Sequence, residues 1–273
     1  MLRDILITVL FGIVEGITEW LPISSTGHLI LLDRVLKMPL KGASMELFEV
    51  VIQLGAILAV AVLFWHELNP FSRKKAKEER SATFVLWGKV LLATLPAAVL
   101  GLLLDDLITA RLYHHVVVAA ALIVYGVAFI LLEKQRKRAP FATQIEEITP
   151  RNAFFVGCFQ SLSLIPGTSR SGSTILGGML LGLSRPTAAR FSFFLAIPTM
   201  AGAGVLKGVK FFLRGNVLTG KEAILLLVGT LTAFLTSLAV IRFLMDFVRR
   251  HSFAPFGAYR IALGALVLIV SFL

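Results

Sequence analysis

The chain has few charged side chains and a single cysteine among its 273 residues. Charged residues make up 16% of it and hydrophobic residues 57%, whereas a soluble domain carries about 25% charged and 45–50% apolar residues. A soluble fold is excluded, because it would have to bury more apolar surface than this length allows. The lone Cys158 excludes an internal disulfide. No set of residues has the spacing of a structural zinc site.

Acidic residues are also scarce, since 16 Asp and Glu stand against 27 Lys and Arg, for a net charge of +11. A basic balance can indicate a nucleic-acid partner. Here, however, the basic residues cluster in short segments between apolar runs, which is the pattern that orients membrane proteins. We therefore expect membrane lipids and no nucleic acid as partners.

The apolar residues are gathered in long runs, and a helix needs about 20 mostly apolar residues to cross a bilayer. Six runs qualify, at about 47–65, 84–104, 113–132, 188–206, 223–247 and 256–273. Four more are too short, and each of the two pairs they form flanks a polar turn: about 5–14 with 29–36, and 152–165 with 173–183. Broken apolar segments of this kind are typical of re-entrant helices, whose irregular backbone is buried in protein or lines a wet cavity.

The two broken pairs resemble each other. Gly12 to Leu31 aligns with Gly157 to Leu176 without a gap, although few positions are identical. Each pair is followed by three spans, and because three is odd the second unit must be inverted. The predicted fold is an all-α integral membrane protein with six spans and two re-entrant pairs. It forms one domain, 1–273, from a first repeat, 1–135, and an inverted second repeat, 150–273.

Basic residues predict the orientation of this domain. They are concentrated in 66–83, in 133–151 and at Arg249 and Arg250. All three segments lie on one side in the predicted topology, and the positive-inside rule assigns that side to the cytoplasm. Both termini then lie outside. One basic group argues against this orientation: Lys207, Lys210, Arg214 and Lys221.

The first polar motif reads Glu15-Gly-Ile-Thr-Glu19-Trp-Leu-Pro22-Ile-Ser-Ser-Thr-Gly-His28. Its two acids are four residues apart and share a helix face, and acids inside a membrane usually face a cavity and function there. Pro22 should end the helix. The following turn leads into a half-helix whose free N–H groups suit an anion. A helix cap explains only one hydroxyl, so we take these as site candidates: Glu15, Glu19, Ser24, Ser25, Thr26, Gly27 and His28.

The second motif reads Pro166-Gly-Thr-Ser-Arg170-Ser-Gly-Ser173. A guanidinium among Ser, Thr and Gly can grip a phosphate with two hydrogen bonds. The alternative is an ion pair with Glu15 or Glu19 that joins the repeats, and both roles are compatible if the pair forms in the empty site. The candidates here are Gln160, Ser169, Arg170, Ser171 and Gly172.

Glu49 and Gln53 are lesser candidates at the start of the first full span, again four residues apart. They either line the same cavity and contact the substrate, or they hold helices together by hydrogen bonds. The sequence does not separate these two roles.

Both motifs resemble those of the undecaprenyl-diphosphate phosphatase family, the bacitracin-resistance proteins. Phe48 to Gly55 and Gly157 to Gln160 match the family as well, and the resemblance covers essentially the whole chain. It implies hydrolysis of undecaprenyl diphosphate, which recycles the lipid carrier of peptidoglycan and other envelope polymers and confers resistance to bacitracin. It also implies the bacterial cytoplasmic membrane, a site open to its outer face, and a divalent cation, Mg²⁺ or Ca²⁺. A homodimer is a further, open expectation.

Several mechanisms fit these residues. Phosphoryl transfer needs mostly positioning and charge neutralisation, which the half-helix N-termini and Arg170 would supply. Ser25 is the preferred nucleophile, with Glu19 as base and His28 as proton donor to the leaving phosphate. Glu15 would bind the cation, with Glu19 as a second candidate ligand, or would orient Glu19. Attack by His28 or directly by water stays open. The rival function is a transporter or flippase of a phosphorylated lipid or small anion, because inverted repeats are typical of transporters.

Overall fold

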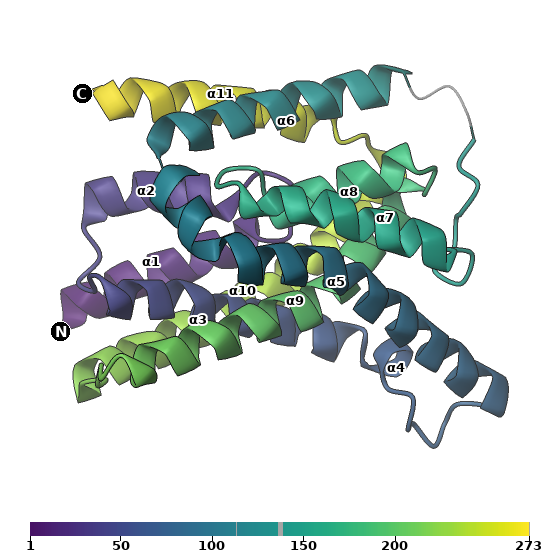
Figure 1. The fold of residues 1–273 in the computed structure, drawn as a ribbon, viewed down its shortest axis with the longest axis horizontal. Coiled ribbons are helices and arrows are strands. Elements are labelled where there is room, and N and C mark those ends of the chain that lie inside the picture. The colour runs from purple at the N-terminus through teal and green to yellow at the C-terminus, as the bar shows by residue number, and fades with distance from the viewer. Residues whose placement is uncertain (113, 136–138, 273) are drawn as a thin grey trace.

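The computed structural model describes residues 1–112, 114–135 and 139–272, and this part of the chain is built of helices (Figure 1). In chain order they are α1 (Leu2–Thr18), α2 (Ser25–Leu36), α3 (Ala43–Leu63), α4 (Trp65–Leu68), α5 (Lys77–Leu112), α6 (His115–Gln135), α7 (Pro150–Ser161), η1 (Leu162–Leu164), α8 (Arg170–Leu180), α9 (Arg185–Leu213), α10 (Gly220–Arg250) and α11 (Ala254–Phe272).

Six helices in the described part of the chain are long and apolar enough to cross a membrane, namely α3, α5, α6, α9, α10 and α11. Each lies where the sequence predicted a span, so the chain is a multi-pass membrane protein. The predicted limits were too narrow for α5 and α9. α9 begins early because the Ser184 side chain accepts a hydrogen bond from the Thr187 N–H at 3.2 Å, which caps the helix before its apolar run.

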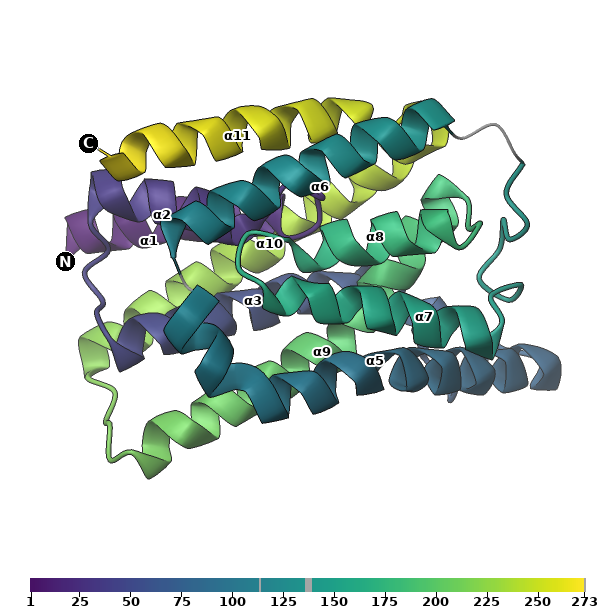
Figure 2. The same ribbon diagram turned by 45° about the horizontal axis from the view of Figure 1, so that its top comes forward.

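α1, α2, α7 and α8 have no such length. Figure 1 shows that α1 and α2 have their outer ends at the end of the molecule where both termini lie. α7 and α8 have theirs at the opposite end, beside α4 and the connection from α6. In both pairs the connecting turn lies in the interior, as the turned view also shows (Figure 2).

Small residues let these short helices pack closely on long ones. α1 lies along α10, and α7 lies along α5. A Cβ added to Gly12 would come within 2.7 Å of the Gly229 carbonyl oxygen, and one on Gly157 within 2.1 Å of the Ala93 carbonyl oxygen. Such contacts are possible only for glycine, and close backbone approach is typical of helix pairs in membranes.

The largest buried apolar cluster surrounds the two interior turns. Trp20 and Ile23 of the first turn belong to it, together with Ile175 of α8 and Phe193 of α9. Trp20 is fully buried and meets Phe193 edge to face at 5.2 Å. Large apolar side chains on the outer faces of the spans are exposed, Leu235 to 63% for example. This is the distribution expected of helices that face lipid, and the polar motifs therefore meet inside the bundle.

Candidate active site

The two interior turns have the same backbone at equivalent positions. Ser24 precedes α2 with φ 72° and ψ 102°, and Ser169 precedes α8 with φ 72° and ψ 124°. A positive φ is costly for a residue with a side chain, and such strain gathers at functional sites. These two serines align in the overlay of the motifs, so α2 and α8 each begin from a turn of the same backbone conformation.

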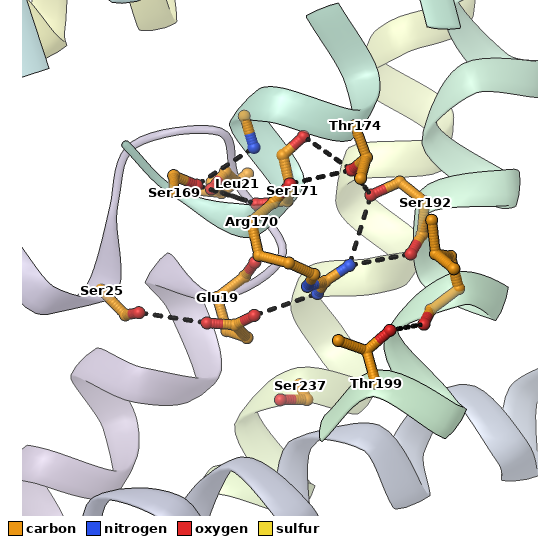
Figure 3. A network of polar contacts seen from close by, with 12 residues as sticks. Glu19, Leu21, Ser25, Ser169, Arg170, Ser171, Thr174, Ser192, Thr199 and Ser237 are labelled. Atoms are coloured by element: carbon orange, nitrogen blue, oxygen red, sulfur yellow. Dashed lines mark hydrogen bonds and ion pairs between the residues drawn. The ribbon is translucent and has the colours of Figure 1, made fainter. Parts of the chain in front are cut away.

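Glu19 is the point where the two motifs meet (Figure 3). The Ser25 hydroxyl donates a hydrogen bond to Glu19 Oε2 at 3.0 Å, and Arg170 Nη2 donates to Oε1 at 3.0 Å. Ser25 and Arg170 are the first residues of α2 and α8 and are aligned in the overlay of the motifs. The Glu19 carboxylate thus binds the Ser25 hydroxyl of the first motif and the Arg170 guanidinium of the second.

Arg170 is fixed on its other sides as well. Its Nη1 donates to the Ser192 carbonyl oxygen at 2.8 Å and to the Ser192 hydroxyl at 3.3 Å. The guanidinium lies over the Trp20 ring at 5.5 Å, a cation–π distance. The predicted ion pair with Glu19 is confirmed, while Glu15 does not take this role.

Two further contacts of the second motif lie beside this ion pair, one to the first turn and one within α8. The Ser171 hydroxyl donates to the Glu19 carbonyl oxygen at 2.8 Å and lies 3.2 Å from that of Leu21. Ser169 Oγ accepts from the Gly172 N–H at 3.1 Å and caps α8. Ser171 therefore joins the second motif to the first turn beside Glu19, whereas Ser169 and Gly172 fix the start of α8, where Arg170 lies.

Arg260 was missed by the sequence reasoning. It comes from α11, is fully buried, and donates to the carbonyl oxygens of Pro22 at 3.0 Å, Gly167 at 3.0 Å and Thr168 at 2.9 Å. One guanidinium therefore binds the backbone of both turns. The available signal was a lone charge in the last apolar run, since charges inside a membrane are usually functional and face the interior.

Unpaired polar atoms gather in the same place. Among the described residues, Glu15 Oε1 and Oε2, Ser24 Oγ and Arg170 Nε are buried without a hydrogen-bond partner. Glu15 is fully buried. A folded protein leaves few such atoms, and each calls for an explanation. One explanation is that these donors and acceptors are free to bind a ligand.

Other candidates face elsewhere. His28 Nδ1 donates to the Ser24 carbonyl oxygen at 2.7 Å, and its Nε2 lies 2.7 Å from the hydroxyl of Tyr259, on whose ring it stacks. It bonds neither Ser25 nor Glu19. Gln160 is buried and donates to the Thr199 hydroxyl at 3.1 Å, so it joins α7 to α9.

The remaining four candidates lie on α2 and α3 and are buried or half-buried. Thr26 and Gly27 lie in the first turn of α2, where Thr26 is half-buried and Gly27 buried. Glu49 and Gln53 are half-buried on α3.

Six membrane-crossing helices around a buried acid, hydroxyl and arginine define a multi-pass membrane protein with an interior site suited to an anion. Comparison with known proteins gives the particular family. The chain belongs to the family described as bacitracin resistance protein BacA, whose model matches residues 8–266.

Curated relatives cover the whole chain. An undecaprenyl-diphosphatase of Enterococcus faecalis (strain ATCC 700802 / V583) is 53% identical over 95% of each chain. One of Streptococcus thermophilus (strain ATCC BAA-250 / LMG 18311) is 53% identical over 97% of this chain and 92% of its own. One of Streptococcus pyogenes serotype M4 (strain MGAS10750) is 51% identical over 100% of this chain and 98% of its own.

Proposed function

We propose that this protein hydrolyses undecaprenyl diphosphate to undecaprenyl phosphate and inorganic phosphate, and so recycles a lipid carrier and confers bacitracin resistance. Relatives that are about half identical over the full length carry the name of this activity. The observation that carries the proposal is the hydrogen bond from Ser25 to Glu19, with Arg170 on the same carboxylate. A hydroxyl beside a base and a cation is the arrangement that phosphoryl transfer needs.

In the proposed first step, Ser25 Oγ attacks the terminal phosphorus of the diphosphate. The proton moves from Ser25 to Glu19, the new O–P bond forms, and the bond to the bridging oxygen breaks. Undecaprenyl phosphate leaves and phosphoserine remains. Glu19 gives up the proton it took from Ser25 to the departing undecaprenyl phosphate or to water, and is a carboxylate again. It then takes a proton from the water that attacks the phosphoserine. The bond between phosphorus and Ser25 Oγ breaks, Ser25 takes the proton from Glu19, and phosphate is released.

The other residues bind and orient. Arg170 Nε has no partner among the described residues and is available to a phosphate oxygen, and the guanidinium shifts from Glu19 to the substrate as the substrate binds. The N-terminus of α2, with Ser24, Thr26 and Gly27, gives N–H and O–H donors to an anion. Both ring nitrogens of His28 are engaged, with the Ser24 carbonyl oxygen and the Tyr259 hydroxyl. Its proton reaches the leaving group only after a change of rotamer.

The proposed divalent cation fits this site through Glu15. Mg²⁺ is commonly held by one or two carboxylates together with substrate phosphates. Both oxygens of Glu15 are buried without a partner in the described part of the chain, whereas both oxygens of Glu19 are engaged. Glu15 is therefore the proposed ligand. When bound, the cation neutralises charge on the diphosphate oxygens.

We propose an inverted repeat with re-entrant pairs α1–α2 and α7–α8 as the architecture behind the site. Three relations support it. The pairs enter from opposite ends of the molecule (Figure 1). α1 packs on α10, the middle span of the second half, as α7 packs on α5, the middle span of the first. The turns at Ser24 and Ser169 share their backbone conformation.

The proposed location is the bacterial cytoplasmic membrane, with both termini and the substrate entrance on the outer side. The basic connections support this orientation. Their described residues lie with α4 at the end opposite the termini (Figure 1), and Arg136, Lys137 and Arg138 fall outside the described residues. A homodimer stays a prediction, which the mass of the protein–detergent complex tests.

The deciding test is phosphate release from a C15 isoprenyl diphosphate by purified protein in detergent. Vectorial transport does not exist in a micelle, so a transporter or flippase releases nothing. We expect turnover that requires added Mg²⁺ or Ca²⁺ and that is lost in Ser25→Ala. A folded wild-type protein that binds the diphosphate without cleaving it would favour the transporter.

A further inference from the structure

A second concentration of arginine lies away from the two motifs. A cavity of about 550 Å³ is lined by residues of α3, α4, α9 and α10. Its polar lining consists of Glu67, Arg190, Arg242, Asp246 and Arg249. Its apolar lining consists of Leu63, Phe64, Ile241 and Met245.

The charges of this cavity are only partly balanced. Arg190 pairs with Glu67. Arg249 lies 3.8 Å from Asp246, and both side chains are largely exposed. Arg242 makes no hydrogen bond or ion pair with the part of the chain that the structure describes. The cavity therefore keeps one net positive charge, carried by an unpaired guanidinium.

Arg242 occupies a position where such a charge is unusual. It is exposed on the spanning helix α10, two turns before the helix ends at Arg250, next to Phe243, which is 57% exposed. Arg242, Asp246 and Arg249 share one face of α10. An arginine among lipid-facing side chains needs an anionic partner or has to reach the interface. The cavity leaves room for a partner.

We propose that this cavity binds the headgroup of one anionic phospholipid, with its phosphate on Arg242. The single net positive charge matches a lipid of single net negative charge. The apolar side chains beside it suit the glycerol backbone and the start of the acyl chains. A guanidinium binds a phosphate through two parallel hydrogen bonds. Basic pockets between membrane helices recognise anionic headgroups in this way. Arg190, whose Nε has no partner among the described residues, is a second donor.

The test is native mass spectrometry of the full-length protein in detergent, titrated with phosphatidylglycerol or phosphatidylcholine. Wild type should prefer phosphatidylglycerol. Arg242→Gln should lower its affinity for that lipid about tenfold and leave phosphatidylcholine unchanged. Arg242→Lys, which keeps the charge, should lose less. Arg250→Gln is the matched control, because Arg250 is exposed at the same helix end and does not line the cavity.

Three results would overturn the proposal. One is Arg242→Gln with wild-type affinity for phosphatidylglycerol. Another is an equal loss in Arg250→Gln, which would mean general surface charge. The third is displacement of the lipid by soluble glycerol 3-phosphate at equal concentration, which would mean a site for a free phosphate. Arg242→Gln removes no hydrogen bond or ion pair within the described part of the chain, and an unchanged thermal unfolding curve checks its fold.

Discussion

At the scale of single residues, the Glu19 carboxylate makes two interactions, and the one with Arg170 opposes its proposed role as a base. Its carboxylate holds the Ser25 hydroxyl through one oxygen and Arg170 through the other. The ion pair is well shielded, since the side chains of Arg170 and Glu19 are 10% and 8% exposed. A substrate phosphate that takes over Arg170 releases Glu19 to act as a base. We therefore propose that the ion pair belongs to the empty site and that substrate binding replaces it.

The role of Ser25 predicts a trapped intermediate. Protein quenched in acid during turnover of a diphosphate labelled in its terminal phosphate should carry label that is stable to acid, because phosphoserine resists acid and phosphohistidine does not. Ser25→Ala should carry none and lose turnover by at least 10³-fold, on the order of losses for essential catalytic groups. Ser271→Ala is the control, because this hydroxyl of α11 bonds the Val267 carbonyl oxygen of its own helix at 2.6 Å, and the variant should keep most activity. Acid-labile label would indicate His28 instead.

Arg170→Lys separates bidentate binding from simple charge. Lysine keeps the charge without the planar fork, so we expect kcat to fall on the order of 10³-fold, more than KM rises. Arg185→Lys is the matched control. Arg185 lies outside the two motifs and binds the Glu133 carboxylate through two hydrogen bonds, Nε to Oε1 at 2.8 Å and Nη2 to Oε2 at 2.5 Å. It should lower the melting temperature and spare kcat. Near-normal kcat in Arg170→Lys would sink the phosphate role.

At the scale of helices, a side chain from α11 joins both polar turns. Arg260→Gln should remove donors from the carbonyl oxygens of Pro22, Gly167 and Thr168, at a cost of roughly 1–3 kcal/mol for each group left unpaired. Melting temperature and kcat should fall together, because the turns carry Ser25 and Arg170. Thermal unfolding in detergent and phosphate release would measure this. An unchanged melting temperature and an unchanged kcat would show that the two turns keep their structure without Arg260.

Helix contact itself is tested by Gly157. A Cβ there would lie 2.1 Å from the Ala93 carbonyl oxygen, so Gly157→Ala must push α7 off α5, at about 1–3 kcal/mol. Gly88→Ala in α5 is the control, since nothing lies within 4 Å of its added Cβ. Thermal unfolding should separate the two variants. Equal melting temperatures would mean that this close packing contributes nothing to stability.

The elements were predictable from sequence, and their contacts only in part. Length of apolar sequence revealed the spans, and the Gly- and Ser-rich breaks revealed the two turns. The pairing of Arg170 with Glu19 was predicted as an alternative because a buried charge needs a partner. The carbonyl cluster around Arg260 and the stacking of His28 on Tyr259 could not be predicted. They depend on which distant helices pack together, and no local pattern records that.

At the scale of the whole molecule, the termini and the basic connections lie at opposite ends (Figure 1). Cysteines at Lys74 and Gln135, both exposed, should resist an impermeant thiol reagent in intact cells. A cysteine at Val217, 82% exposed in the α9–α10 connection, should react. Half-buried Cys158 is first replaced by serine. The reverse labelling pattern would mean the opposite orientation in the membrane, with the substrate entrance on the cytoplasmic side.

The central claim is that two motifs from separate halves of the chain form one catalytic unit. A double-mutant cycle in kcat tests it most directly, with Glu19→Gln, Arg170→Lys and the two combined. Groups that act as a unit have non-additive effects. The account predicts that the double variant is hardly slower than the slower single variant. If the two losses in kcat simply multiply, Glu19 and Arg170 act independently, and the single shared site is contradicted.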